Sequence, residues 1–285
     1  EVVGDGTYVL GIAPRQQVAR VVRYAVARGI TRFAALAPSD SYGTNMVAAL
    51  AAAAAETGAT VTQVEYYDPA GDANDAVKRL ADYDRRAAAL RSQRAELRER
   101  NDDVARQALR RLENRDTVGD VDFQALLLPA SGEELQKLAA LLPYYDVDPS
   151  RVRMLGTAQW DADGIGAEPA LVGGWFAGPP RDQRAGFEAE FRSTYKRRPH
   201  RLASLAFDAT AVAAVLANQA GPSADRRQAF SRARLASPNG FAGVDGIFRM
   251  LPSGEAERGL AVIEIERANF KVLSPAPQSF QAAVN

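Results

Sequence analysis

The spacing of hydrophobic residues divides the chain between residues 31 and 156 into two kinds of segment. Short apolar and β-branched runs predict strands at 31–38, 60–67, 121–129 and 151–156. Between these runs, apolar residues recur every three or four positions, which predicts helices at 43–58, from about residue 73, and at 132–143. Strands that alternate with helices in this way predict right-handed crossovers and a mainly parallel sheet, the architecture of an α/β protein.

The rest of the chain has helical spacing with fewer strands. Helices are predicted at 14–29, 182–198, 202–221 and about 224–235. Phe187, Phe191 and Tyr195 are spaced by four and share one face of the 182–198 helix. Strands around a Pro-Ser-Gly turn are predicted within 241–267. The late helices therefore pack either on the sheet described above or in a second lobe.

The segment from Arg85 to Glu113 interrupts one of the predicted crossovers. It holds nine arginines and five acidic residues. Asn101 or Asp102, in its middle, can cap a new helix. Two antiparallel helices over about 84–120 are therefore predicted as an insertion into the crossover. Their apolar line is formed by Leu90, Leu97, Val104, Ala105, Leu109 and Leu112.

Three roles are open for this segment: a nucleic-acid arm, a coiled coil, or a solvated helical insertion. The chain has 35 basic and 35 acidic residues, so no global field attracts it to nucleic acid. Within the segment, acidic residues are mixed among the arginines and aromatic residues are missing, and both features disfavour nucleic-acid binding. We interpret the segment as a solvated helical hairpin, of which a partner-docking surface is a special case.

Composition excludes several kinds of chemistry. The chain has no cysteine and one histidine, His200, which excludes disulfides and thiolate metal sites and leaves a Ser-His-Asp triad a single base. His200 lies beside one proline and three arginines, which favours an exposed linker. Neither a phosphate-binding loop nor a dinucleotide fingerprint is present, and Asp161 and Asp163 are typical of a turn. No cofactor or metal site is expected, and no run of 18 apolar residues predicts a transmembrane segment.

Candidate ligand-binding residues follow from the predicted sheet. Ligands of open parallel sheets bind outside the carboxyl ends of the strands, where loop amides and helix N-termini converge. Four segments meet this condition: 38–43, 68–72, 129–133 and 156–161. The serines can equally be helix caps, and the tryptophan can equally be part of the core. The candidates are Ser39, Ser41, Tyr42, Ser131, Thr157, Gln159 and Trp160.

Several motifs, taken in order, resemble one known family. They are "SDSYG" (39–43), "LVGGWFAGPP" (171–180), "ASLAFDA" (203–209), "FAGVDGIF" (241–248) and "PSGEAERGLAVIEI" (252–265). The chain resembles the type I periplasmic binding proteins of the Leu/Ile/Val-binding family. The resemblance implies two α/β lobes with parallel sheets and flanking helices, which close on a small molecule and do not catalyse a reaction.

The resemblance also implies a division of the chain. Residues 1–14 resemble a crossover out of an N-terminal lobe whose opening βα units are absent, so one lobe is expected to be incomplete. The expected division is 15–178 for the C-terminal lobe with its insertion at 84–120, 179–240 for helices of the N-terminal lobe, and 241–285 for closing strands and tail, mainly of the C-terminal lobe.

Site residues carry over from the family only in part. Tyr42 matches the tyrosine of the family's "YG" motif. The second aromatic or polar contact of the family falls near Ala130 and Ser131, and the acid that pairs with an amino-acid ammonium falls near Ala158 and Gln159. Neither position is acidic or aromatic. A buried ammonium without a carboxylate is costly, so binding of a free amino acid is not expected from these positions.

One branch of the superfamily is similar in a further respect. The helical insertion and the phrases "LLPYYDVDP" and "GFAGVDGIFR" resemble penicillin-binding-protein activators, which are outer-membrane lipoproteins that stimulate peptidoglycan synthases by contact. The resemblance implies a non-enzymatic activator of this kind, or alternatively a solute-binding receptor of an ABC transporter. The expected partners are accordingly a peptidoglycan synthase or an ABC permease, with a small-molecule ligand and no nucleic acid. The expected location is the periplasm, with a lipid anchor in the full-length precursor.

Overall fold

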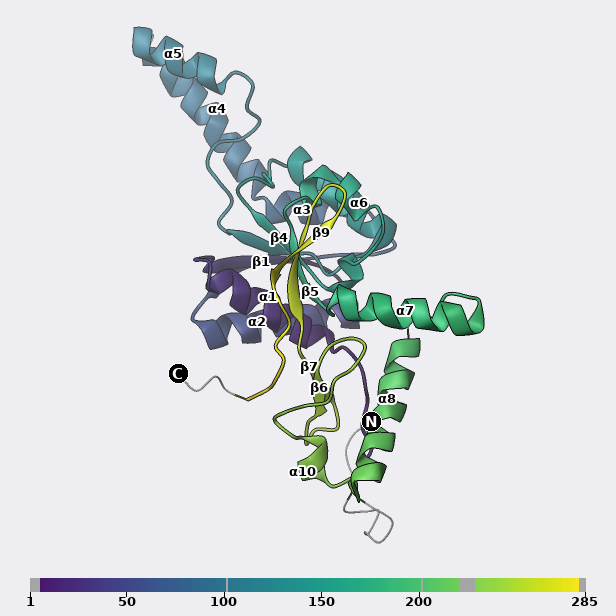
Figure 1. Cartoon of the computed structure of the whole chain (residues 1–285). Coiled ribbons are helices and arrows are strands. Elements are labelled where there is room, and N and C mark those ends of the chain that lie inside the picture. Colours follow the sequence, from purple (N-terminus) through teal and green to yellow (C-terminus); the bar gives the residue numbers. More distant parts are fainter. Residues whose placement is uncertain (1–5, 101, 201, 221–228, 282–285) are drawn as a thin grey trace. The chain divides into compact units, whose positions relative to one another are not determined.

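The computed structural model describes residues 6–100, 102–200, 202–220 and 229–281 (Figure 1). The chain divides into two compact units. Unit 1 consists of residues 1–20, 176–263 and 271–285, and unit 2 consists of residues 21–175 and 264–270. All seven candidate ligand-binding residues belong to unit 2.

The strands confirm the expected α/β class with a mainly parallel sheet. Seven strands follow the order β2-β1-β3-β4-β5-β8-β9. β1 pairs in parallel with β2 and with β3, and β3 pairs in parallel with β4. The strands are β1 (Arg32–Pro38), β2 (Thr60–Tyr67), β3 (Ala125–Leu127), β4 (Arg153–Gly156), β5 (Trp175–Gly178), β8 (Ala261–Ile265) and β9 (Phe270–Ser274).

The third strand is shorter than the expected 121–129. Gln124, immediately before it, uses its side-chain Oε1 to accept the backbone N–H groups of Thr31 (2.9 Å) and Arg32 (3.1 Å). The side chain thus satisfies donors at the beginning of β1. Only residues 125–127 continue as a regular ladder between β1 and β4.

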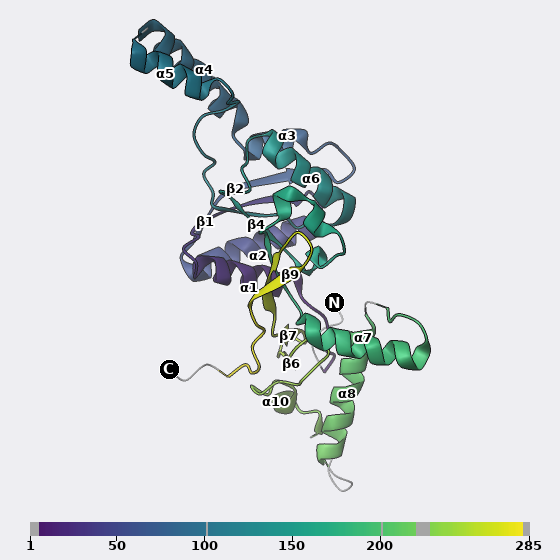
Figure 2. The same cartoon turned by 45° about the horizontal axis from the view of Figure 1, so that its top comes forward.

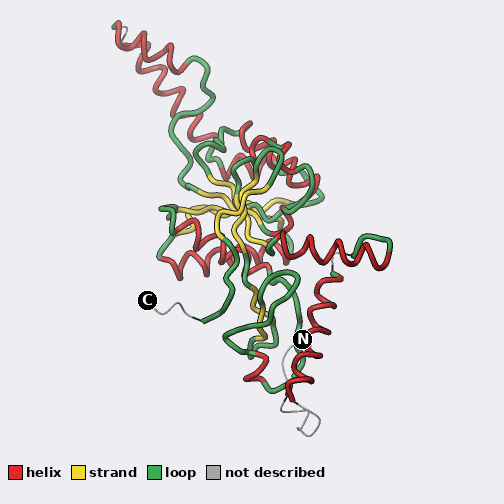
Figure 3. The backbone as a smooth tube through the Cα atoms, viewed as in Figure 1, coloured by secondary structure: helices red, strands yellow, loops and turns green. Residues whose placement is uncertain are grey.

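Helices cover both faces of the sheet in unit 2. The end of α1 (Pro14–Val26) and all of α2 (Ser41–Thr57) lie on one face, and α3 (Asn74–Leu80) and α6 (Gly132–Tyr144) lie on the other (Figures 1 and 3). Helix α2 ends where Gly58 adopts the left-handed conformation (φ 72°) and its N–H reaches the carbonyls of Ala54 and Ala55. Three single 3-10 turns follow β4, at Ala158–Trp160, Ile165–Ala167 and Pro169–Leu171.

The arginine-rich insertion folds as two helices, as expected. Helices α4 (Tyr83–Arg100) and α5 (Asp103–Leu112) lie side by side and project away from the sheet (Figures 1 and 2). Asp102 caps α5, because its side chain accepts the N–H of Ala105 at 2.7 Å. The predicted apolar line is wrong at Val104, which is 69% exposed, whereas Leu90 and Ala105 are buried. A new helix begins at Asp103, so the seven-residue spacing that joins Leu90 to Val104 does not continue into it.

Two arginines of the insertion fix its base and close its two helices. Arg86 is 7% exposed and donates to the carbonyls of Ala81 (3.2 Å), Asp146 (3.3 Å) and Gly119 (2.8 Å). Arg94 of α4 donates to the carbonyl of Leu112, at the end of α5, at 2.5 Å. These arginines therefore have structural partners within the hairpin and at its base.

Unit 1 combines helices with a two-stranded antiparallel ribbon. Strands β6 (Phe248–Met250) and β7 (Ala256–Arg258) pair through the Pro-Ser-Gly turn, in which Gly254 has φ 86°. The helices are α7 (Arg181–Tyr195), α8 (Ala203–Ala220) and α10 (Arg232–Leu235). Residues 224–228, the first part of the helix expected at 224–235, lie outside the described residues. The core of this unit is formed by Val212, Leu216, Leu235, Phe248, Met250 and Ala256.

Aromatic side chains remain exposed on α7 and α8. Phe187, Phe191 and Tyr195 contact one another in sequence, with ring centroids 5.9 and 4.5 Å apart. Phe207 of α8 joins them at 5.4 Å from Phe187. The side chain of Tyr195 is 60% exposed and that of Phe207 is 55% exposed, so the shared face predicted for α7 forms a surface cluster.

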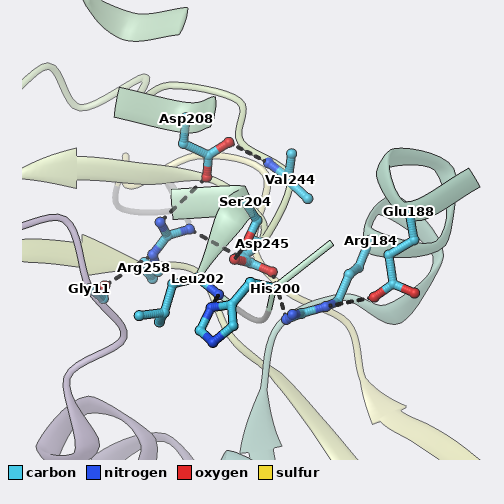
Figure 4. Close-up of polar contacts among 10 residues, drawn as sticks. All are labelled: Gly11, Arg184, Glu188, His200, Leu202, Ser204, Asp208, Val244, Asp245 and Arg258. Atoms are coloured by element: carbon cyan, nitrogen blue, oxygen red, sulfur yellow. Dashed lines mark hydrogen bonds and ion pairs between the residues drawn. The ribbon is translucent and has the colours of Figure 1, made fainter. Parts of the chain in front are cut away.

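A buried ion-pair network holds unit 1 together (Figure 4). Arg258 of β7 approaches the Asp208 carboxylate of α8 at 3.4 Å, and both side chains are almost completely buried. The Nε of Arg258 also donates to the carbonyl of Gly11 at 3.0 Å. Asp245 accepts from Ser204 at 2.7 Å and from Arg184 at 3.2 Å. The network therefore ties the N-terminal segment, α7, α8 and β7 to the loop before β6.

The burial of this network changes the proton affinity of its members. Burial raises the pKa of Asp208, while the backbone N–H of Val244 and the Arg258 guanidinium oppose the rise. Burial likewise lowers the pKa of Arg258, and the carboxylates of Asp208 and Asp245 oppose that change. The folded chain thus binds the Asp208 proton more tightly than the unfolded chain, so this contribution to stability is lost as the pH rises through the folded pKa.

Replacement of the buried guanidinium should be strongly destabilising and pH-dependent. We expect Arg258→Met to lower the free energy of unfolding by about 3–5 kcal/mol at neutral pH, because buried carboxylates lose their cation. The deficit should shrink as the pH is lowered, because the variant raises the pKa of Asp208 further and protonation removes the charge. Thermal unfolding at several pH values measures both effects.

The matched control for this variant is Arg249→Met, which breaks the more accessible Arg249–Glu257 pair of the same ribbon. We expect the control to lose less than about 1 kcal/mol, with little dependence on pH. Equal losses in the two variants at all pH values would contradict the role assigned to Arg258.

The insertion should be removable without unfolding unit 2. We expect replacement of residues 91–115 by a flexible linker of about eight residues to leave cooperative thermal unfolding intact, because Leu90 and Arg86 at the base are retained. Arg86→Ala in the full chain should instead cost about 2–3 kcal/mol, because three carbonyls lose their donor. Loss of cooperative melting in the deletion variant would show that the hairpin is part of the folding unit.

Candidate ligand-binding site

The strand order of unit 2 creates a switch point next to β1. The chain passes from β1 to β2 on one side and then crosses to β3 on the other side. The connections that leave β1 and β3 therefore diverge at the carboxyl ends of these strands, where open α/β sheets bind ligands. We call the edge at which β1, β2, β3 and β4 end the carboxyl edge.

The loop after β1 begins α2 with an aspartate cap. Asp40 accepts the N–H of Gly43 through Oδ1 at 2.8 Å, so Asp40 is the N-cap of α2. Ser39 and Ser41, on either side of Asp40, have exposed side chains. The N–H of Ser39 donates to the carbonyl of Tyr67 at 2.8 Å and extends the pairing of β1 with β2. The two serines therefore reach solvent at the carboxyl edge without capping α2.

Gly43 explains why glycine follows the tyrosine in this loop. A Cβ at this position would lie 1.9 Å from the carbonyl oxygen of Pro38, the last residue of β1. Only glycine permits so close an approach of the first turn of α2 to the end of the strand. The tight turn places the preceding residue, Tyr42, at the carboxyl edge.

Tyr42 and Thr157 join the loops that follow β1 and β4. Tyr42 is half-buried, and Thr157 is 1% exposed. Burial raises the pKa of Tyr42, a hydrogen bond with the Thr157 side chain lowers it, and the nearby Asp40 carboxylate raises it. The net pKa is above the ordinary value, so the phenol is neutral at physiological pH and can both donate and accept.

The remaining candidates from the sequence lie at different depths. Trp160 has no exposed surface, and its indole Nε1 donates to the carbonyl of Ala130 at 3.2 Å. It thus ties the loop after β4 to the loop after β3 as part of the core. Gln159 and Ser131 are exposed, and Ser131 is the N-cap residue of α6 without a side-chain capping bond.

Two polar residues at this edge were missed by the sequence analysis, Tyr67 at the end of β2 and Glu134 in the first turn of α6. Tyr67 is 4% exposed and is the one residue of β2 that is classed as buried. Burial raises the pKa of Tyr67, and the Glu134 carboxylate raises it further. Ser131 and Glu134 have the spacing of a capping box. From the sequence alone, the Glu134 side chain would therefore be expected to cap the start of its own helix and not to contact another strand end.

The opposite edge of the same sheet carries a cavity of about 630 Å³ at the base of the hairpin. Its lining includes Arg32, Gln124 and Arg151, which precede or begin β1, β3 and β4, together with Arg86. The cavity and the candidate site therefore lie at opposite ends of the strands.

Two further properties concern metal and membrane binding. Among the residues that the structure describes, no group of three or more His, Asp or Glu side chains could hold a metal ion. Within the same residues, no helix is both long enough and apolar enough to span a membrane.

Comparison with known protein families identifies the family of this chain. The family model described as periplasmic binding protein matches residues 1–269, so the chain belongs to the periplasmic binding protein family. The resemblance drawn from the sequence motifs is thereby confirmed, and the members of this family are binding proteins rather than enzymes. A search of curated proteins found no significant match.

Solved structures share the fold at low sequence identity. A branched-chain amino acid ABC transporter protein from Rhodospirillum rubrum has a TM-score of 0.67 and 17% identity, covering 93% of this chain and 67% of its own. A substrate-binding protein from Desulfitobacterium hafniense in complex with Leu has a TM-score of 0.56 and 16% identity, and the match covers 92% of this chain and 65% of that protein. A solute-binding protein from Rhodopseudomonas palustris in complex with 3,4-dihydroxybenzoic acid has a TM-score of 0.54 and 12% identity, and the match covers 95% of this chain and 68% of that protein. The chain thus spans about two thirds of their length.

The tight turn before α2 should tolerate no side chain at Gly43. We expect Gly43→Ala to lower the free energy of unfolding by about 1–3 kcal/mol, because the new Cβ overlaps the Pro38 carbonyl. Gly186→Ala in α7 is the matched control, because its Cβ meets open space and alanine favours a helix by up to about 1 kcal/mol. Equal melting temperatures for the two variants would contradict the constraint.

Proposed function

We propose that the chain is the ligand-binding part of a solute receptor that delivers a small molecule to an ABC permease in the periplasm. The observation that carries this proposal is the contact between Tyr42 and Thr157, which brings the loops after β1 and β4 together beside the switch point. Family membership supports binding as the general task, because periplasmic binding proteins hold small molecules.

The chemistry of the site supports binding without catalysis. The two tyrosine hydroxyls at the carboxyl edge have raised pKa values, so they remain protonated and are poor nucleophiles. Thr157 is engaged by Tyr42 and by the N–H of Gln159, which its Oγ1 accepts at 3.4 Å. Neutral hydroxyls of this kind select a ligand through hydrogen bonds.

The hairpin favours a second candidate function, contact with a protein partner. Helices α4 and α5 leave from the α3-to-β3 connection, so they project from the end of the sheet opposite the carboxyl edge. A surface there can engage a partner without covering the ligand site. This arrangement supports an activator of the penicillin-binding-protein type, anchored as a periplasmic lipoprotein and acting on a peptidoglycan synthase.

Calorimetry on the full chain tests the first proposal. L-leucine and 3,4-dihydroxybenzoate serve as probes, because structural neighbours were solved with these compounds. We expect at least one probe class to bind, and Tyr42→Ala to weaken its binding about tenfold or more, because a ligand hydrogen bond and its buried contact are lost.

The control is Tyr144→Ala, which removes a 71% exposed tyrosine at the far end of α6. This variant should bind as the wild type does. Equal affinities of the two variants would overturn the proposed site. Failure of every probe, together with capture of a peptidoglycan synthase that depends on residues 91–115, would favour the activator function instead.

A further inference from the structure

The cavity at the base of the hairpin is a feature of unit 2 that the proposed receptor function does not use. Its volume of about 630 Å³ lies within the range of small-molecule sites. The lining comes from α4, from the connection between α5 and β3, from the loop between α6 and β4, and from the start of β1. The seven candidate residues of the carboxyl edge are not part of this lining.

Four arginines and four aspartates line this cavity. Guanidinium groups gathered around one cavity favour a carboxylate or phosphate ligand, because each group offers planar donors to an oxyanion. The pairing of each charged group decides whether donors remain for a ligand. The four arginines are Arg32, Arg86, Arg115 and Arg151.

Two of these arginines form ion pairs at the surface. Arg151 pairs with the lining residue Asp120, and Arg32 pairs with Asp122 at 3.5 Å. All four side chains are about half exposed or more. Exposed pairs of this kind contribute little to stability, so either arginine can exchange its carboxylate for a ligand.

The other lining aspartates are largely engaged within the protein. Asp146 accepts the hydroxyl of the buried Thr117, and Asp148 accepts the backbone N–H of Ser150 at 2.8 Å. Asp116 is the one lining aspartate for which the described residues provide neither a hydrogen bond nor an ion pair.

Arg86 is a buried cation without a carboxylate in hydrogen-bonding contact. Its side chain is 7% exposed, and its two terminal nitrogens donate to three backbone carbonyls. The Asp146 carboxylate approaches Nη2 only to 3.7 Å. Within the described part of the chain, the Arg86 Nε has no hydrogen-bonding partner. A buried charge that is incompletely paired costs free energy, so an anion in the adjoining cavity would stabilise it.

Arg115 supplies a further donor to the cavity. Its side chain is exposed, and among the residues that the structure describes its guanidinium has neither a hydrogen bond nor an ion pair. Its backbone carbonyl accepts the Arg94 guanidinium at 3.0 Å, so the main chain at this position is fixed to the hairpin. Arg86 and Arg115 thus present two incompletely paired cations, against the single unengaged carboxylate of Asp116.

We propose that this cavity binds a small organic oxyanion, a molecule that carries a carboxylate or a phosphate group. The charged group of the ligand takes its donors from the arginines. The buried lining residues Phe123 and Val152 offer an apolar surface for the rest of the molecule. A ligand held in this way joins the base of the hairpin to the starts of the strands. The site lies at the edge opposite Tyr42 and does not depend on the receptor function.

Three probes separate the charge from the rest of the ligand. They are phenyl phosphate, benzoate and benzamide, which has the shape of benzoate without its charge. Calorimetry on the full chain should show binding of at least one of the two anions with a Kd below about 1 mM, and no binding of benzamide. Comparison of the two anions distinguishes a phosphate ligand from a carboxylate ligand. Exchange of backbone amide hydrogens should slow at residues 114–123 and 146–152 when the anion binds.

Asp120→Asn is the sharpest variant, because loss of structure would not produce its expected effect. It releases Arg151 and removes a negative charge from the cavity, so it should strengthen anion binding about threefold to tenfold. The matched control is Asp103→Asn, which removes the same charge from the exposed Asp103–Arg106 pair of α5, outside the cavity. The control should keep wild-type affinity.

Arg115→Gln should act in the opposite direction. We expect it to weaken anion binding about fivefold, because a charge-assisted hydrogen bond is lost. Its control is Arg98→Gln, which removes the same charge from an exposed position of α4 that does not line the cavity. Cooperative thermal unfolding of each variant establishes that the fold is intact.

The outcomes separate this site from the proposed receptor site. Tyr42→Ala should leave the anion affinity and the slowed exchange at residues 114–123 unchanged. Equal affinities of Asp120→Asn and Asp103→Asn, or equal binding of benzamide and the anions, overturn the oxyanion site. Anion binding that Tyr42→Ala abolishes, without slowed exchange at 114–123, overturns it and supports the receptor site. Failure of both anions to bind at about 1 mM overturns it whatever ligand the carboxyl edge takes.

Discussion

Parallel pairing of β1, β2, β3 and β4 is the constraint on which the rest of unit 2 depends. Parallel strands need crossover connections, so every strand ends at the same edge and every helix returns to the other edge. Loops that leave strands therefore collect the polar groups around Tyr42 and Glu134. The connection that returns from α3 to β3 carries the hairpin at the opposite edge. Side chains at the carboxyl edge and side chains on the hairpin can thus change independently within one sheet.

Unit 1 depends on a different kind of interaction, the buried network around Arg258. Here one guanidinium joins segments that are distant in sequence, from Gly11 to Asp208 and the Asp245 carbonyl. Hydrophobic packing alone would hold α8 against the ribbon, but it would not fix their orientation as narrowly as directional bonds do. Gly243 belongs to this arrangement, because a Cβ there would lie 2.6 Å from Asp208. Gly243 and Asp245 of the "GVDG" stretch are therefore explained by the geometry of the buried charges.

Local patterns in the sequence predicted most of the elements but less of the site. The strand at 60–67 and the cap at Asp102 follow from periodicity and from the chemistry of a single turn. Tyr42 could be found because it lies directly after a strand and before a glycine. Tyr67 and Glu134 could not be paired, because the sequence separates them by 67 positions and only the strand order brings β2 and α6 to the same edge. The exposure of Val104 has a similar origin, since the start of a new helix resets the periodicity.

A buried side chain connects the loops that follow β3 and β4 at the carboxyl edge. Loops that leave adjacent parallel strands converge outside the carboxyl ends of those strands, so side chains from both loops lie close together. Here Trp160 fills the space beneath the loop after β4 and bonds to the carbonyl of Ala130, in the loop after β3. The two loops are thus held together by a buried indole.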